Sequence, residues 1–312
     1  MKLTPFYREG RHRFFFASPE TGATHIERSC FLPDDYLFVI NDWYIPDHPS
    51  GVQAYRRIVA SGYRNLRIMC NTRTEQQILI EDFRFPPEST LFCPRHFFHG
   101  SKSFAAALAR RAGTIRYDAV LNARSKPYKN RWAAAGVANL ALIDFEAARP
   151  EIPCRYHNER HLTLEEVASV LQSSRVGLCL SFIEGASLAS LEYLLCGLPV
   201  VSTHSLGGRD NWYTAENCIL VGPGVEDGLA NRFDHVQLRE EVVEAVATWI
   251  ERMEAGGVEA RKIREEALTV NQRFTDDFLH EIGRIVGGDA DPGRQRLVPA
   301  LKPYPSYGVY AN

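Results

Sequence analysis

Two glutamates, Glu184 and Glu192, bracket a loop and the start of a helix in the segment SFIEGASLASLEYLLCGLPVVST, residues 181–203. An apolar run precedes the loop, and small residues occupy the first helical positions. Backbone amides at a helix start have no partner within the helix and point outward with the positive end of the helix dipole. Here those amides belong to Gly185, Ala186, Ser187 and Leu188. Such an arrangement binds anions, so the segment predicts a phosphate site.

A carboxylate beside a diphosphate is repulsive unless it accepts hydrogen bonds from hydroxyl groups and cations lie nearby. Because helical side chains lean toward the N-terminus, Glu192 can present its carboxylate near the start of the helix. Ribose and sugar hydroxyls would supply the donors. The same spacing occurs at Glu151 and Glu159 without such a loop, so the loop carries the prediction. The alternative is that Glu184 is an ordinary loop charge and Glu192 a solvated helix residue.

The required cations occur in LNARSKPYKN, residues 121–130, a loop that follows another apolar run. Arg124 and Lys129 flank a proline there, and a guanidinium and an ammonium in this position can clamp an anion at the carboxyl edge of a sheet. Lys126 is a third cation whose direction the sequence leaves open. Together, the two segments predict a site for a diphosphate.

Short apolar runs alternate with helical stretches along most of the chain, which indicates parallel strands with helices on the faces of the sheets. The expected strands lie near residues 36–40, 66–70, 90–93, 119–122, 140–143, 176–181, 200–203 and 218–221. The expected helices lie near residues 52–61, 75–83, 102–111, 131–138, 164–173, 187–196, 236–255 and 258–286. The alternation restarts after the helix at 102–111. We therefore expect an α/β protein with two doubly wound, Rossmann-like domains that face a cleft, where loops after strands bind ligands.

The expected domains are residues 1–113 and 114–286, followed by an extended C-terminal arm at 287–312. Residues 1–33 show no clear periodicity, so we expect an arm or an irregular first strand and a reduced N-terminal domain. Within the second domain, Thr163 and Glu166 have the spacing of a capping box and predict the start of a helix.

The segment EGASLASLE, with CGLPVVST after it and GGRD at 207–210, resembles the donor-binding half of retaining GT-B glycosyltransferases. The resemblance is strongest to the large family-four group, which is marked by an E-x7-E pair. NARSKPYKN is similar to the G-R-x-x-x-x-K-G phosphate loop of that family, with Ala123 and Asn130 at positions where glycine is usual. The resemblance spans about residues 117–286. It implies a GT-B fold, a nucleotide-diphosphate sugar as substrate, and neither a metal nor another cofactor. It also implies that Arg124 and Lys129 bind the diphosphate, Glu192 the ribose hydroxyls and Glu184 the donor sugar.

Candidates for the acceptor side follow expected strands in the first domain. His96 and His99 come after the strand at 90–93, and Asp42 follows the strand at 36–40. The family's acceptor half often carries a histidine near the reacting sugar, which one of these two could supply. The alternative is a packed or solvent-exposed histidine. Asp42 could orient an acceptor hydroxyl or belong to a turn.

The composition, with 45% hydrophobic and 24% charged residues, is that of an ordinary globular protein. A net charge of −2 gives no general attraction for nucleic acid. Apolar runs long enough to span a bilayer are lacking, as is a signal-peptide pattern at the start. We expect a cytoplasmic protein and leave peripheral attachment to the inner face of the membrane open.

The resemblance, together with the two segments that carry it, implies the metal-independent transfer of a hexose, with retained anomeric configuration, from a nucleotide-diphosphate sugar to an acceptor hydroxyl. The acceptor is a glycan, a lipid-linked molecule or a small molecule. The first alternative is a non-catalytic nucleotide-sugar-binding homologue or partner subunit, and the second is a GT-B-fold epimerase. The base, the sugar and the linkage are not predicted.

Overall fold

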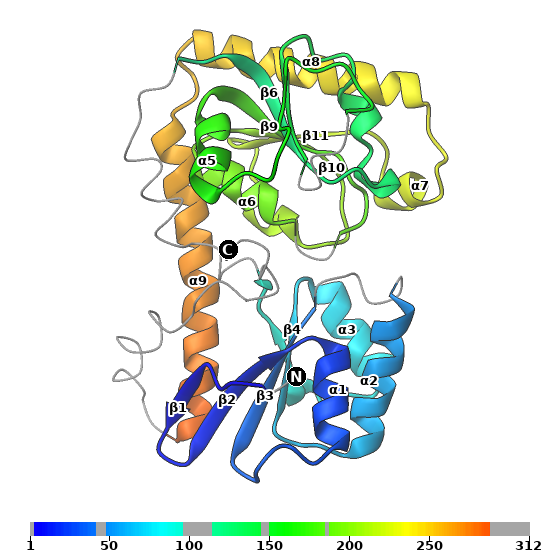
Figure 1. The fold of residues 1–312 in the computed structure, drawn as a ribbon, viewed down its shortest axis with the longest axis vertical. Coiled ribbons are helices and arrows are strands. Elements are labelled where there is room, and N and C mark those ends of the chain that lie inside the picture. Colours follow the sequence, from blue (N-terminus) through cyan, green and yellow to red (C-terminus); the bar gives the residue numbers. More distant parts are fainter. Residues whose placement is uncertain (1–2, 42–47, 96–113, 145–149, 185–186, 288–312) are drawn as a thin grey trace. The chain divides into compact units, whose positions relative to one another are not determined.

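The computed structural model describes residues 3–41, 48–95, 114–144, 150–184 and 187–287 (Figure 1). These residues form two compact units. The first unit contains the described residues up to 95, Glu184, and those from Gln272 onward, and the second unit contains the remainder. Each unit is an α/β structure with its own sheet.

The first unit has a five-stranded sheet in the order β1-β2-β3-β4-β5, in which β1 is antiparallel to β2 and the other neighbours are parallel. The strands are β1 (Tyr7–Glu9), β2 (His12–Ala17), β3 (Asp35–Ile40), β4 (Leu66–Cys70) and β5 (Thr90–Phe92). The helices between them are α1 (Pro19–Glu27), α2 (Pro49–Ser61), α3 (Arg73–Glu81) and the short 3-10 helix η2 (Pro87–Ser89). Figure 1 shows α1, α2 and α3 together on one face of this sheet.

Residues 7–27 are regular structure, so the expectation of an arm or an irregular strand before residue 33 is corrected: β1, β2 and α1 belong to the sheet and its helical layer. The periodicity is missing because β2 is covered on both faces. Phe14 packs 5.7 Å from the ring of Tyr36, whereas Phe15 belongs to the core beneath the helices. A strand that is buried on both faces reads as a continuous apolar run without alternation.

The end of α9 (Ala260–Val286) belongs to the first unit and packs against its sheet. Phe278 is fully buried, with its ring 5.3 Å from that of Phe38 and 5.9 Å from that of Phe16. One turn later, Glu281 forms an ion pair with Arg67 of β4. The sequence groups this part of the helix with residues 114–286, but its contacts from Gln272 onward complete the first unit.

The second unit has six parallel strands in the order β11-β10-β9-β6-β7-β8. The strands are β6 (Tyr117–Asn122), β7 (Leu140–Ile143), β8 (Tyr156–His157), β9 (Ser174–Cys179), β10 (Val200–Thr203) and β11 (Cys218–Val221). The helices are α5 (Leu164–Gln172), α6 (Leu188–Leu195), α7 (Val225–Leu229), α8 (His235–Glu254) and the first part of α9, with the 3-10 helices η4 (Pro127–Lys129), η5 (Arg131–Ala134) and η6 (Arg209–Trp212).

This strand order is that of a doubly wound Rossmann-like domain, because the chain builds outward from β6 in one direction and from β9 in the other. The loops after β6 and β9 therefore leave the sheet at its topological switch point, where ligands bind in such folds. The fold class predicted from the sequence, two Rossmann-like α/β units, is confirmed. The capping box at Thr163 and Glu166 is also confirmed at the start of α5. The helix expected at 102–111 lies outside the described residues.

We expect the Phe278→Ala substitution to lower the free energy of unfolding by about 3–5 kcal/mol, because it leaves a cavity beside the fully buried ring of Phe38. Chemical denaturation measures the change. His280→Ala, at an exposed position of the same helix, is the control and should change stability by less than about 0.5 kcal/mol. Equal losses in the two variants would contradict the packing of α9 on this sheet.

Candidate functional site

The loops on either side of the switch point are joined by a side chain. Asn130, at the end of the loop after β6, donates a hydrogen bond from Nδ2 to the carbonyl oxygen of Leu180, one residue after β9, at 2.9 Å. Asn130 adopts the left-handed backbone conformation with φ 48° and ψ 38°. Glycine is favoured there, and asparagine is among the few residues that also adopt it. Asn130 therefore adopts a backbone conformation that suits glycine, and its side chain adds a bond between the loops.

Three cations lie close together at this edge of the sheet. Lys129 ends η4 and is half-buried, with its Nζ 5.4 Å from the ring centre of Tyr128. Burial lowers the pKa of Lys129 to about 8, and the positive charges of Arg209 and Arg124 add to this lowering, while Cys179 opposes it. Arg124 itself is exposed. The carboxyl edge at the switch point is therefore positively charged, as an anion site requires.

The helix on the other side of the switch point begins where the sequence predicts. Ser187 is the N-cap of α6 in an extended conformation, and both Ser187 and Leu188 are buried. Ser187 also contacts the thiol of Cys179 at the end of β9. Gly185 and Ala186, the other two residues of the predicted amide cradle, lie outside the described residues, so that part stays a prediction.

Glu192 lies inside the unit, on the second turn of α6, with 9% of its surface exposed. Asn122, the last residue of β6, donates from Nδ2 to Glu192 Oε2 at 3.2 Å. Burial raises the pKa of Glu192 to about 7, and the bond from Asn122 partly offsets this. The alternative of a solvated helix glutamate is therefore wrong. Glu184 is likewise buried, at 5% exposure, rather than an exposed loop charge.

The close approach of α6 to β9 depends on a glycine. A Cβ atom on Gly177 would lie 2.3 Å from the ring of Tyr193, so a larger residue would push the helix away from the sheet. Tyr193 in turn accepts a hydrogen bond at its hydroxyl from the backbone amide of Asn122, at 2.7 Å. This contact holds α6 beside the end of β6 and so brings Glu192 to Asn122.

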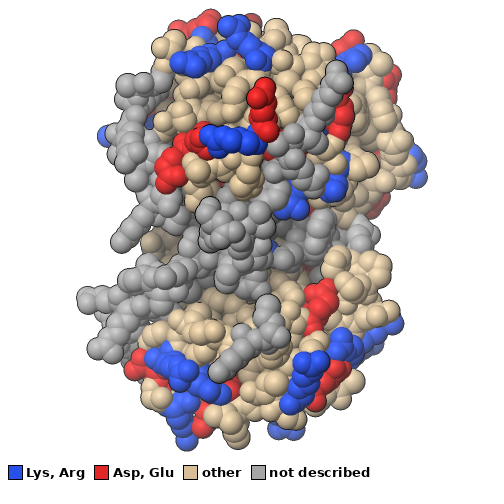
Figure 2. Space-filling view, in the orientation of Figure 1, with Lys and Arg blue, Asp and Glu red and all other residues tan. Residues whose placement is uncertain are grey.

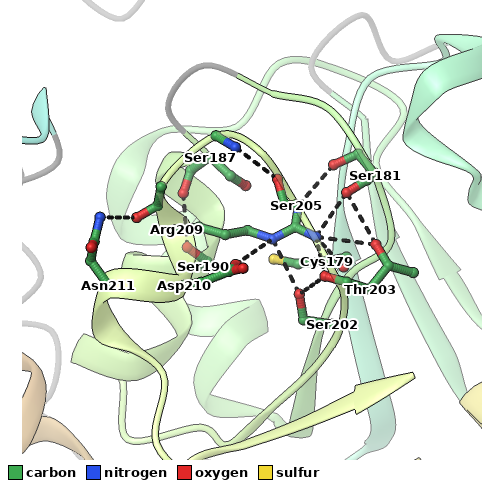
Figure 3. Close-up of polar contacts among 12 residues, drawn as sticks. Cys179, Ser181, Ser187, Ser190, Ser202, Thr203, Ser205, Arg209, Asp210 and Asn211 are labelled. Atoms are coloured by element: carbon green, nitrogen blue, oxygen red, sulfur yellow. Dashed lines mark hydrogen bonds and ion pairs between the residues drawn. The ribbon is translucent and has the colours of Figure 1, made fainter. Parts of the chain in front are cut away.

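Arg209 is fully buried at the carboxyl ends of β9 and β10 (Figure 3). Its Nη2 donates to the carbonyl oxygens of Ser181 at 2.8 Å and Thr203 at 2.7 Å. Its Nη1 donates to Ser181 Oγ at 2.9 Å, and its Nε to Ser202 Oγ at 3.1 Å. In the sequence, Arg209 is only part of the GGRD segment, and no pattern there distinguishes a buried arginine from a loop arginine.

A second network of buried hydrogen bonds lies on the β7 and β8 side of the switch point. Arg131, at the start of η5, is 3% exposed and donates from Nη1 to Asp144 Oδ2 at 2.8 Å. The amide of Asp144, one residue after β7, donates to Asn158 Oδ1 at 2.7 Å. Asn158 Nδ2 in turn donates a hydrogen bond to the carbonyl oxygen of Asp144, also at 2.7 Å. The ends of β7 and β8 are thus held in place beside the cationic loop.

Comparison with known proteins gives one family and one fold. Residues 144–237 match the family model of Glycosyl transferases group 1. The crystal structure of Anabaena HepE in complex with UDP-glucose aligns with 86% of the chain and 78% of its own length, at 16% identity and a TM-score of 0.57. The pneumococcal O-GlcNAc transferase GtfA, in complex with UDP and GlcNAc, aligns with 85% of the chain and 55% of its own length, at 10% identity and a TM-score of 0.55. Residues 144–237 therefore resemble the group 1 glycosyltransferases, and the chain has a GT-B-like fold.

S. aureus TarM, a variant of which was solved with UDP, also aligns with 83% of this chain and 53% of its own length, at 11% identity and a TM-score of 0.55. A search of curated protein sequences finds no match. The family match contains Glu184, Glu192 and Arg209, whereas the cationic loop at 121–130 lies before it. A match over a residue range assigns no role to a side chain, so the roles of Arg124, Lys129, Glu184 and Glu192 all stay predictions.

The predicted acceptor-side residues, Asp42, His96 and His99, all lie outside the described residues. Within the described ranges, no cluster of three or more histidine, cysteine, aspartate or glutamate side chains is arranged to hold a metal ion. Nor does any helix in those ranges have the length and apolar character needed to cross a membrane. All seven cysteines are free thiols.

We expect the affinity for inorganic pyrophosphate to fall as the pH rises through about 8. Lys129 carries its positive charge below its pKa of about 8 and loses it above, so attraction for an anion weakens. Isothermal titration calorimetry between pH 6 and pH 10 measures the change. Lys129→Arg is the matched control, because its guanidinium stays charged throughout. A parallel decline in both proteins would show that another group titrates.

Proposed function

We propose that this glycosyltransferase moves a hexose from a nucleotide-diphosphate sugar to an acceptor hydroxyl, with retained anomeric configuration and without a metal. The observation that carries the proposal is the cationic switch point: Lys129 lies near the charges of both Arg124 and Arg209. A carboxylate, Glu192, lies at the same edge of the sheet and is held by the last residue of β6. The cations that would bind the diphosphate thus lie close to the carboxylate that would accept hydrogen bonds from the ribose hydroxyls.

The chemistry follows from where charge develops. When the glycosidic bond breaks, negative charge accumulates on the β-phosphate of the leaving nucleoside diphosphate. In this proposal, Arg124, Lys129 and the amides at the start of α6 stabilise this charge. A β-phosphate oxygen then accepts the proton of the attacking hydroxyl, so the reaction needs no separate side-chain base.

The buried glutamates orient the donor. Glu192 accepts hydrogen bonds from the ribose hydroxyls, and Glu184 accepts them from the hydroxyls of the sugar. Donation by hydroxyl groups, together with the nearby cations, favours the charged form of Glu192, whose pKa is raised to about 7 in the unliganded protein. UDP-glucose is the first donor to test, because the crystal structure of the similar protein HepE contains it.

The acceptor is a hydroxyl-bearing glycan, lipid-linked molecule or small molecule. Asp42 and either His96 or His99 remain the proposed contacts on this side. A thermal-shift panel of UDP-, GDP-, ADP- and dTDP-sugars identifies the donor, since a ligand at 100 times its dissociation constant adds about 2.7 kcal/mol of stability. Release of nucleoside diphosphate and the anomeric configuration of the product then test the transfer. Binding without any release, even with acceptors supplied, would favour a non-catalytic binder, and a changed sugar without acceptor would favour an epimerase.

We expect Arg124→Ala and Lys129→Ala each to lower turnover of the identified donor by about 10²–10³, the loss typical of a missing charge-stabilising donor. Steady-state release of nucleoside diphosphate measures this. Lys126→Ala, in the same loop and exposed, is the control for a general change in charge. Normal turnover in Arg124→Ala would refute its assignment to the diphosphate.

We expect Glu192→Gln to weaken nucleoside diphosphate binding by roughly tenfold or more, because a hydrogen bond to a charged group contributes about 1.5–3 kcal/mol. Its affinity for pyrophosphate should not decrease, since pyrophosphate has no ribose. Calorimetric titration with both ligands separates the two effects. Equal weakening toward both ligands would place Glu192 at the phosphates or in a purely structural role.

A further inference from the structure

Arg209 joins the carboxyl ends of β9 and β10 through its hydrogen bonds. Its guanidinium donates to backbone carbonyl oxygens of Cys179 and Ser181 at the end of β9, and of Thr203 at the end of β10. It also donates to the hydroxyls of Ser181, Ser202 and Thr203. Figure 3 shows the guanidinium surrounded by these oxygen atoms. Ser181, in the loop that leads from β9 to α6, accepts from Arg209 at both its carbonyl oxygen and its hydroxyl.

The position of Arg209 separates it from the residues that touch a ligand. The side chain is completely buried, so no ligand reaches it from solvent. Its charge nevertheless acts on Lys129, across β9, in the same direction as the charge of Arg124. A permanent cation therefore lies behind the edge at which Lys129 and the N-terminus of α6 are presented.

We infer that Arg209 is a positioning residue of the donor site, which sets the shape of the loop after β9 and supplies a fixed positive charge behind the diphosphate without touching it. This inference rests on the proposed function for its ligand. In this arrangement Arg124 and Lys129 contact the diphosphate directly, and Arg209 acts on it from behind without contact. The electrostatic part distinguishes it from a purely structural tie, which would leave the titration of Lys129 unchanged.

The first measurement needs no ligand. The chain has six lysines, so the Cε signal of Lys129 can be followed by NMR in protein labelled with ¹³C-lysine and assigned by its loss in Lys129→Arg. The charged and ionisable groups that face Lys129 are Arg124 from the loop after β6, Cys179 from β9 and Arg209 from η6. In Arg209→Gln, which keeps donors for the carbonyl oxygens but no charge, we expect the pKa of Lys129 to rise. Arg209→Lys should restore it.

The second measurement is calorimetric binding of inorganic pyrophosphate and of uridine at pH 7. Arg209→Gln should weaken pyrophosphate binding about tenfold, which is less than the loss expected for a donor in direct contact. Uridine binding should change little. Ser202→Ala, which removes the partner of Nε but no charge, and Arg67→Met, which removes a buried arginine of the first unit, are the matched controls and should bind pyrophosphate normally.

An unchanged Lys129 titration in folded Arg209→Gln overturns the inference, as does equal weakening toward pyrophosphate and uridine. If Arg209→Gln fails to fold, Arg209→Lys decides: the pKa of Lys129 must then stay near that of the unmodified protein, and a rise overturns the inference. Failure of the unmodified protein to bind pyrophosphate or any nucleoside diphosphate contradicts the proposed function instead, and the ligand-free titration still decides the electrostatic role of Arg209.

Discussion

The edge of the second sheet depends on a buried guanidinium that satisfies the ends of two strands. Carbonyl oxygens beyond the end of a strand no longer accept hydrogen bonds from the neighbouring strand. Where they are buried, they need another donor. Arg209 supplies several donors from one rigid group, and the strand ends supply the acceptors that a buried cation needs. Because of this mutual requirement, the strands end in a fixed geometry, and the loop that leads to α6 starts from a defined point.

Two ionisable groups beside this edge have pKa values shifted toward neutrality, and both shifts have the same cause. Burial raises the pKa of Glu192 to about 7 and lowers that of Lys129 to about 8, because each charged form loses water. An acid with a raised pKa and a base with a lowered pKa at the same edge of a sheet are typical of functional sites. A ligand with phosphates and hydroxyls would add negative charge beside Lys129 and hydrogen-bond donors beside Glu192.

The sequence predicts the second unit well because its elements are signalled locally. The capping box at Thr163, the glycine after α6 and the apolar strands all carry short-range patterns, and the strand order then places the loops after β6 and β9 together. The burial of Glu192 and the contacts of Arg209 depend on side chains that meet only in three dimensions. Periodicity also fails at β2, where both faces are covered. Asn130 adopts a backbone conformation that glycine favours, and its side chain adds a bond to Leu180 that glycine could not make.

The last turns of α9 have a consequence for synthesis on the ribosome. The aromatic face formed by Phe16 and Phe38 emerges early, but Phe278, which covers it, is made some 240 residues later. All described residues of the second unit precede Phe278 in the sequence, so this unit can assemble while that face is still uncovered. The first unit must therefore remain incomplete, and exposed to chaperones or to aggregation, until Phe278 has been synthesised.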